Sequence, residues 1–142
     1  MKFTGQCVCG GVTWTVDGEP VSQFYCHCRS CQKATSAPAV AIAIFPASDV
    51  AFSGQPASLS ITGEEGAAAR LYCAGCGTRV ANKPGAEGFT ELLAMFPPLC
   101  DSTDWFQPSM HLFYEESGIE VSDKLPKYVD MPEAFGGSGK TL

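Results

Sequence analysis

The chain has 142 residues, of which 45% are hydrophobic and 17% are charged. This length suits one domain with a core, and the composition argues against a disordered or low-complexity protein. The formal net charge of −6 argues against a protein that binds double-stranded nucleic acid, because such proteins present a basic surface to the phosphates.

The expected secondary structure is a series of short strands separated by turn residues. Residues 12–16 alternate apolar and polar side chains, and residues 39–45 are apolar throughout, as in a strand buried on both faces. A helical turn is expected over residues 29–34. Further strands are expected over residues 50–52, 59–61, 70–72, 78–80, 92–96 and 111–114. Turn signals lie at Asp17-Gly18, Ser53-Gly54, Thr62-Gly63, Pro84-Gly85 and Pro97-Pro98. The spacing of these strands predicts an all-β domain.

The N-terminal segment contains no apolar run after Lys2, so we expect no signal peptide. The longest apolar stretch, residues 37–45, is much shorter than a membrane span. We therefore expect a cytoplasmic protein that does not bind a membrane. Closely spaced cysteines in a reducing compartment are more often metal ligands than disulfide partners, and this chain has eight cysteines.

Seven of these cysteines form three short clusters. Two of the clusters are pairs, and together the pairs supply four thiolates, the closed tetrahedral set of a structural zinc ion. The third cluster is a triple, which leaves one position open to water or substrate, as at a catalytic zinc ion. The expected ligand sets are Cys7, Cys9, Cys73 and Cys76 for the first ion, and Cys26, Cys28 and Cys31 for the second.

Three alternatives to this assignment remain open from spacing alone. The triple could take a ligand from the pair Cys73 and Cys76, and an iron–sulfur centre could replace zinc, although all-thiolate tetrahedral sites in small β domains more often hold zinc. Either histidine could also complete the triple as a structural site. His27 lies between two ligands, a position from which a side chain usually points away from the metal, and His111 lies in an alternating segment that suits a half-buried strand. Cys100 stands alone and is expected to be a packed apolar residue rather than a ligand.

Basic residues flank the cysteine segments, where they would offset the negative charge of metal-bound thiolates. An ordinary solvated surface explains any one of them equally well. These residues are Lys2, Arg29, Lys33, Arg70, Arg79 and Lys83. We expect residues 131–142, which are rich in glycine at 136–139, to form a flexible tail outside the domain.

The cysteine motifs resemble those of the glutathione-dependent formaldehyde-activating enzyme family, also called the GFA/CENP-V domain. The resemblance covers residues 3–130, which we interpret as the zinc domain. The motifs are the segments 5–14, 26–33 and 70–78, together with 108–113 and 125–128 near the end of the chain.

This resemblance implies a mainly β, Mss4-like β-tent of short antiparallel strands with two zinc ions per chain. It implies that Cys7, Cys9, Cys73 and Cys76 hold the structural ion, whereas Cys26, Cys28 and Cys31 hold the catalytic one. The implied activity is that of a carbon–sulfur lyase, like S-(hydroxymethyl)glutathione synthase. Such an enzyme forms or breaks a thiol adduct of formaldehyde or a related small carbonyl compound. The candidate contacts for the carboxylates of a glutathione-like thiol are Arg29, Lys33 and Arg70, by position only.

The chain departs from the family pattern beside the presumed catalytic site. Gln32 stands where the family usually has arginine, and Ser36 where it usually has glycine. An aromatic residue common in the following strand is also replaced within residues 41–44. A zinc-stabilised binding module without catalysis is therefore the alternative hypothesis, although the intact triple of cysteines favours an enzyme.

Overall fold

We describe the chain from a computed structural model, which covers residues 1–60 and 67–142. The chain forms two compact units. The first comprises Met1–Ser22 and Ala43–Phe106, and the second comprises Gln23–Ile42 and Gln107–Leu142. Within the described residues, no helix has the length and apolar character needed to cross a membrane.

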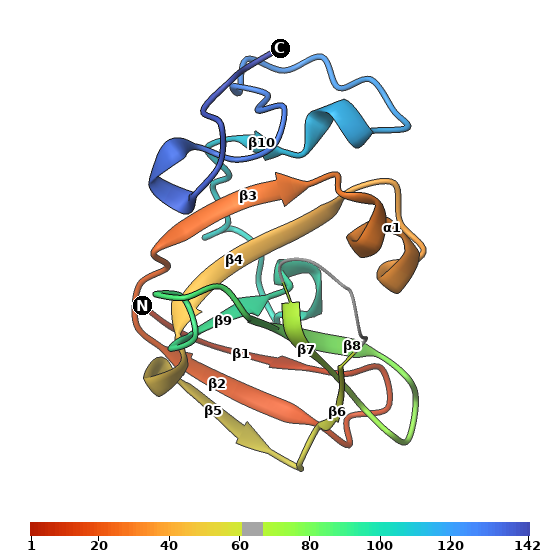
Figure 1. Cartoon of the computed structure of the whole chain (residues 1–142). Helices are drawn as coiled ribbons and strands as arrows, with labels where there is room; N and C mark the ends of the chain where they lie inside the picture. Colours follow the sequence, from red (N-terminus) through yellow and green to blue (C-terminus); the bar gives the residue numbers. More distant parts are fainter. Residues whose placement is uncertain (61–66) are drawn as a thin grey trace. The chain divides into compact units, whose positions relative to one another are not determined.

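The first unit contains a three-stranded antiparallel sheet of β1 (Lys2–Gln6), β2 (Thr13–Asp17) and β5 (Val50–Ser53), with β2 in the middle. These strands lie side by side in Figure 1. Alternate residues of β2 are buried, as the period-two pattern predicts. Gly5 of β1 lies opposite Trp14 of β2, and a Cβ atom at Gly5 would lie only 2.5 Å from the indole ring. Glycine is therefore the residue that allows the ring to pack against this strand.

A second set of strands in this unit follows the order β4-β9-β8-β7-β6, and every pair is antiparallel. β4 begins in the second unit and continues into the first. The hydrophobic core of the unit includes Cys7 and Cys73 among its aliphatic and aromatic side chains. The bounds are β4 (Val40–Pro46), β6 (Ala57–Leu59), β7 (Ala67–Tyr72), β8 (Arg79–Pro84) and β9 (Leu92–Met95), with 3-10 turns η1 (Ala47–Asp49) and η2 (Pro97–Leu99).

The second unit contains the helix α1 (Arg29–Thr35) and, from its second residue onward, the strand β3 (Ser22–Cys26), which pairs in parallel with β10 (His111–Leu112). Tyr25 lies opposite His111 in this register. The 3-10 turns η3 (Tyr114–Glu116) and η4 (Glu133–Phe135) follow. The parallel pair brings the end of β3, where the first of the triple cysteines lies, beside a segment from much later in the chain.

Residues 131–142, expected to be a flexible tail, return to the segment that precedes them. Tyr128 forms a bridge with Thr141, and the Val129 N–H donates to the Lys140 carbonyl at 2.8 Å. The Asp130 carboxylate accepts hydrogen bonds from the backbone and hydroxyl of Ser138. Residues 131–142 are therefore hydrogen-bonded to the segment 127–130. The division of the chain into a zinc domain over residues 3–130 and a tail over residues 131–142 stays a prediction.

The mainly β prediction is confirmed, and α1 covers the predicted helical turn. β2, β4, β5, β7, β8 and β9 fall on predicted strands with shifted ends. Two strands, β1 and β3, were not predicted. The strand expected over residues 111–114 ends at Leu112, because Phe113 adopts a left-handed conformation with φ 53° and turns the chain. The strand expected over residues 59–61 overlaps β6 at Leu59, whereas Ile61 and the turn at Thr62-Gly63 lie outside the described residues.

Candidate metal centres

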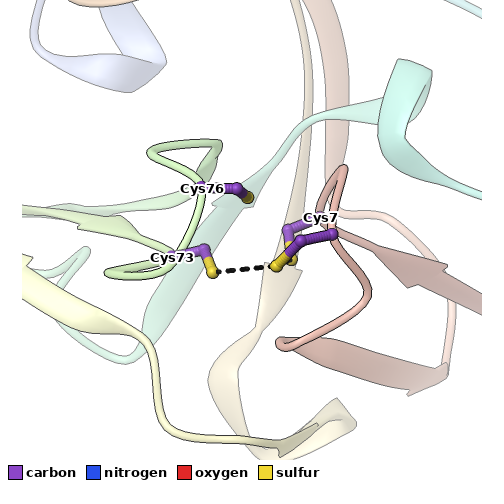
Figure 2. Close-up of side chains that lie close together, drawn as sticks. Cys7, Cys73 and Cys76 are labelled. Atoms are coloured by element: carbon purple, nitrogen blue, oxygen red, sulfur yellow. Dashed lines mark hydrogen bonds between the residues drawn. The ribbon is translucent and has the colours of Figure 1, made fainter.

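Four cysteines of the first unit bring their sulfur atoms together at one point. The Sγ atoms of Cys7, Cys9, Cys73 and Cys76 all lie within 4.8 Å of one another. Figure 2 shows Cys7 on one turn facing Cys73 and Cys76 on another. Spacing predicted this grouping, and the structure brings the four side chains together as predicted.

The two turns that present these sulfurs are built alike. The Cys7 N–H donates to the Val12 carbonyl at 3.0 Å, and the Cys73 N–H donates to the Thr78 carbonyl at 2.9 Å. Each turn closes on a glycine in the left-handed region, Gly10 with φ 75° and Gly77 with φ 79°. Glycine adopts this conformation without steric cost, so the residue after each cysteine motif allows the chain to fold back.

The distances within the cluster fit a tetrahedral ion. Cys9 Sγ lies 3.6 Å from Cys7 Sγ and 3.7 Å from Cys73 Sγ. Metal–sulfur bonds of about 2.3 Å in a tetrahedron place the sulfurs about 3.8 Å apart. Backbone N–H groups of Gly11 and Val12 also donate to Cys9 and Cys7. The donor set and its convergence therefore fit a zinc ion.

Local hydrogen bonds decide which of these thiols ionises most readily. The Thr78 hydroxyl and backbone lower the pKa of Cys76 to about 5, and the Val12 N–H lowers the pKa of Cys7. The Gly11 N–H favours the Cys9 thiolate, but hydrogen bonds with the other three thiols outweigh it and raise the pKa of Cys9 to about 11. The cluster thus already favours thiolate at two of its members.

The second cluster lies within the second unit, on one continuous segment. Cys26 ends β3, Cys28 is the N-cap of α1, and Cys31 lies in the helix. Their Sγ atoms also lie within 4.8 Å of one another. No fourth cysteine, histidine or carboxylate joins this group among the described residues. Three converging thiols fit a metal ion that keeps one position for an exchangeable ligand.

The thiols of this cluster differ in exposure and in pKa. Cys26 and Cys31 are buried, whereas Cys28 is partly exposed. Hydrogen bonds from Cys26 and Cys31 hold the pKa of Cys28 well below its ordinary value, and the backbone N–H of Cys31 donates to its sulfur at 3.3 Å. Hydrogen bonds with Cys28 and Cys31 raise the pKa of Cys26 well above its ordinary value. Among these three thiols, hydrogen bonding therefore favours the thiolate form at Cys28, the most exposed of the three cysteines.

Comparison with known proteins agrees with this arrangement. The model of the family described as glutathione-dependent formaldehyde-activating enzyme, GFA, matches residues 2–116. The chain belongs to the GFA family.

The fold is also similar to a solved structure. A crystal structure of a Rhodobacter sphaeroides protein superposes with a TM-score of 0.55 at 16% sequence identity, over 70% of this chain and 88% of that one. At this identity the similarity concerns the fold alone. The search among curated proteins found no match.

The ring of His27 does not join the converging sulfurs of Cys26, Cys28 and Cys31. This agrees with the expectation that a residue between two ligands points away from the metal. The His27 ring is fully buried, with Nδ1 2.9 Å from Ser117 Oγ and Nε2 2.8 Å from His111 Nδ1. Burial, and then the neighbouring His111, lower the pKa of His27 to about 4. Neither histidine belongs to the group of converging thiols, so neither completes a Cys₃His site in this structure.

Gln32 is a residue of the site that sequence reasoning treated only as a departure from the GFA pattern. Its side chain is buried, and its amide donates to the carbonyl of His27 and, at 3.1 Å, to that of Glu116. It thereby ties α1 to the segment between Cys26 and Cys28. A polar residue on a short helix has no sequence signal that distinguishes this role from solvent exposure.

The three candidate substrate contacts occupy different surroundings. Arg29 and Lys33 are exposed on α1, and Arg29 donates to Gln32 Oε1 at 2.7 Å. Arg70 belongs to β7 of the first unit, where it is 2% exposed and donates to Asn82 Oδ1 at 3.2 Å. The role of all three toward a substrate stays a prediction.

Cys100 belongs to neither cluster among the described residues. It follows η2 and packs against the core of the first unit. Burial, and then the nearby Asp101, raise the pKa of Cys100 to about 12, so its thiol is protonated at neutral pH. These observations agree with the prediction of a packed apolar residue.

Proposed function

We propose that this protein is a zinc-dependent carbon–sulfur lyase that forms and breaks the adduct between a thiol and formaldehyde or a related small carbonyl compound. Glutathione is the candidate thiol. In the forming direction a bond joins the thiol sulfur to the carbonyl carbon, the thiol proton passes to the carbonyl oxygen, and the product is a hydroxymethyl thioether. The convergence of Cys26, Cys28 and Cys31 without a fourth ligand, in a chain of the GFA family, is the observation that supports this proposal.

The proposal gives the two clusters different jobs, within a fold that we assign to the Mss4-like β-tent. The set Cys7, Cys9, Cys73 and Cys76 would hold a structural zinc ion, because two of its members lie in the core of the first unit. The set Cys26, Cys28 and Cys31 would hold a second ion. Zinc at an open site lowers the pKa of a bound thiol and polarises a carbonyl oxygen.

The exposure of the three cysteines favours one direction of approach for a substrate. Cys26 and Cys31 are buried and Cys28 is partly exposed, so a small molecule would reach the cluster from the side of Cys28. Arg29 and Lys33 are exposed cations on the helix that begins at this cluster. They suit the two carboxylates of glutathione, since guanidinium and ammonium groups bind carboxylates through charge-assisted hydrogen bonds. Arg70 is the weaker candidate because it is already buried against Asn82.

The direct test uses ¹³C-labelled formaldehyde and exchange NMR, which measures the rate of interconversion between free formaldehyde and its thiol adduct. We expect the zinc-loaded protein to accelerate this exchange with glutathione above the uncatalysed rate, and less with a thiol that lacks carboxylates. Absence of acceleration with every thiol tested, in protein that binds two zinc ions per chain, would support the binding module instead.

A further inference from the structure

A chain of hydrogen-bonded polar side chains includes His27, the residue between Cys26 and Cys28. The rings of His27 and His111 are buried, and the side chains at its two ends are partly exposed. The chain starts at Ser117 Oγ, which lies 2.9 Å from His27 Nδ1, and passes from His27 Nε2 to His111 Nδ1 at 2.8 Å. His111 Nε2 lies 2.8 Å from Asp123 Oδ2, and the other oxygen of Asp123 lies 2.9 Å from Lys127 Nζ. All of these residues belong to the second unit.

Acceptors at both ends of this chain set the direction of its hydrogen bonds. An ionised carboxylate only accepts, so His111 Nε2 donates to Asp123. The Ser117 hydroxyl donates its single hydrogen to the Ile119 carbonyl at 2.7 Å, so its oxygen accepts from His27 Nδ1. Asp123 therefore holds hydrogen on Nε2 of His111, and Ser117 holds hydrogen on Nδ1 of His27.

Aromatic rings hold the two imidazoles in place from the side. Tyr25 stacks on His111 with ring centroids 5.3 Å apart, and Tyr114 meets His27 edge-on at 4.9 Å. Lys127 Nζ lies 5.6 Å from the centre of the Tyr114 ring. Both imidazoles are almost fully buried.

His27 is anchored at every polar atom. Its N–H donates to the Leu112 carbonyl at 2.9 Å, its carbonyl accepts from Gln32, and its ring bonds to Ser117 and His111. In extended backbone, successive side chains point to opposite sides. Fixing the ring of His27 on one side therefore fixes the direction in which its two neighbours present their sulfurs on the other.

We propose that His111 and Asp123 are positioning residues for the triple-cysteine site, acting through His27 to hold Cys26 and Cys28 in the arrangement that binds the metal ion. The inference rests on the proposed function, because it takes these cysteines as metal ligands. Partners that orient metal-binding groups from behind typically change metal affinity about 10- to 100-fold when removed. Here the orienting group acts on the segment between two ligands rather than on a ligand itself.

The test replaces zinc by Co²⁺ and follows the visible absorption of thiolate-bound cobalt during competition with a chelator. Cys31→Ser protein gives the spectrum of the four-cysteine site, and its subtraction isolates that of the triple. We expect Asp123→Asn and Ser117→Ala, which break the chain at opposite ends, to weaken Co²⁺ binding at the triple about 10- to 100-fold and to alter its spectrum. Binding at the four-cysteine site should be unchanged.

The matched control is Asp130→Asn, because Asp130 is a hydrogen-bonded carboxylate of the same unit whose bonds go to Ser138 and Met131 instead. Asp130→Asn should leave the cobalt spectrum of the triple as in the wild type. Histidine ¹⁵N NMR at pH 8 adds a readout that does not involve metal affinity. It should show hydrogen on Nδ1 of His27 and on Nε2 of His111 in the wild type, and a mixture of tautomers at His111 in Asp123→Asn.

Two results would overturn this inference. In the first, Asp123→Asn and Ser117→Ala lower the thermal stability, but the Co²⁺ affinity and spectrum of the triple stay as in the wild type. This is the outcome expected for a merely structural network. The other is a mixture of tautomers in the wild type. Neither readout depends on turnover, so a protein that shows the expected cobalt and NMR effects but does not accelerate the formaldehyde exchange would refute the proposed function and leave this inference standing.

Discussion

His27 Nε2 lies 2.8 Å from His111 Nδ1, although 84 positions separate the two residues in the chain. The contact joins the segment between two cysteines of the triple to β10, which pairs in parallel with β3. The triple is local in sequence, but the packing behind it comes from the last third of the chain. Changes in that late segment should therefore act on the cysteine site.

Ligand loss should have different consequences at the two clusters. Cys73→Ser removes a proposed ligand from the core of the first unit and should lower the free energy of unfolding by several kcal/mol, because metal binding contributes to folding. Cys31→Ser should keep most of the stability and lose the thiol-dependent exchange. Native mass spectrometry and thermal unfolding check this, and each variant should retain one zinc ion. Equal destabilisation by both substitutions would contradict the division into structural and reactive sites.

Removing the amide of Gln32 should destabilise the second unit. Gln32→Leu keeps the side-chain volume similar but leaves the carbonyls of His27 and Glu116 without their donor, at a cost of about 1–3 kcal/mol. Urea unfolding measures the loss. Lys33→Leu, at the next and exposed position of α1, should change stability by less than about 0.5 kcal/mol. If Gln32→Leu and Lys33→Leu change the free energy of unfolding by the same amount, the Gln32 amide does not stabilise its contacts with His27 and Glu116.

A side chain at position 5 should destabilise the first unit, because it would crowd Trp14. Gly5→Ala places a methyl group 2.5 Å from the fully buried ring of Trp14 and should cost about 1–3 kcal/mol, because the ring cannot move aside. Gly118→Ala is the control, since a Cβ atom there has no neighbour within 4 Å. Differential scanning calorimetry should show a lower melting temperature only for the Gly5 variant. An unchanged melting temperature in Gly5→Ala would contradict this prediction and would mean that β1 and β2 shift to accommodate the methyl group.

Asp123 should make stability depend on acid pH. Its hydrogen bond from Lys127, and then that from His111, hold the pKa of this carboxyl well below its ordinary value. A carboxyl whose pKa is lowered on folding stabilises the fold above its unfolded pKa of about 4, and this contribution disappears as pH falls through the folded value. The wild type should therefore melt at a higher temperature than Asp123→Asn at pH 7, and the difference should shrink below about pH 4. A difference that grows on acidification would contradict this sign.

The sequence predicted most where the information is local. Alternation revealed β2, and the short spacing of Cys26, Cys28 and Cys31 was enough to predict one cluster, because a turn and the start of a helix bring such residues together. The four-cysteine cluster was also predicted, since two similar turns each supply half of a tetrahedral set.

What was missed depends on contacts between distant segments. β1 includes Gly5, which reads as a strand breaker until Trp14 is seen packed against it. The partnership of His27 with His111 depends on parallel pairing of β3 with β10, which no local pattern encodes. Asp123 was missed for the same reason, because only its bond to His111 connects it with the segment of the triple.

The central claim is that the triple of cysteines is a metal site that performs carbon–sulfur chemistry while the four-cysteine cluster holds the fold. The most direct measurement is the ¹³C-formaldehyde exchange rate with glutathione in Cys31→Ser, determined on the same sample as its zinc content. The account predicts a folded protein with one zinc ion per chain and an exchange rate equal to the uncatalysed one, beside an accelerated rate in the wild type with two. A Cys31→Ser protein that holds one ion and matches the accelerated wild-type rate would contradict it.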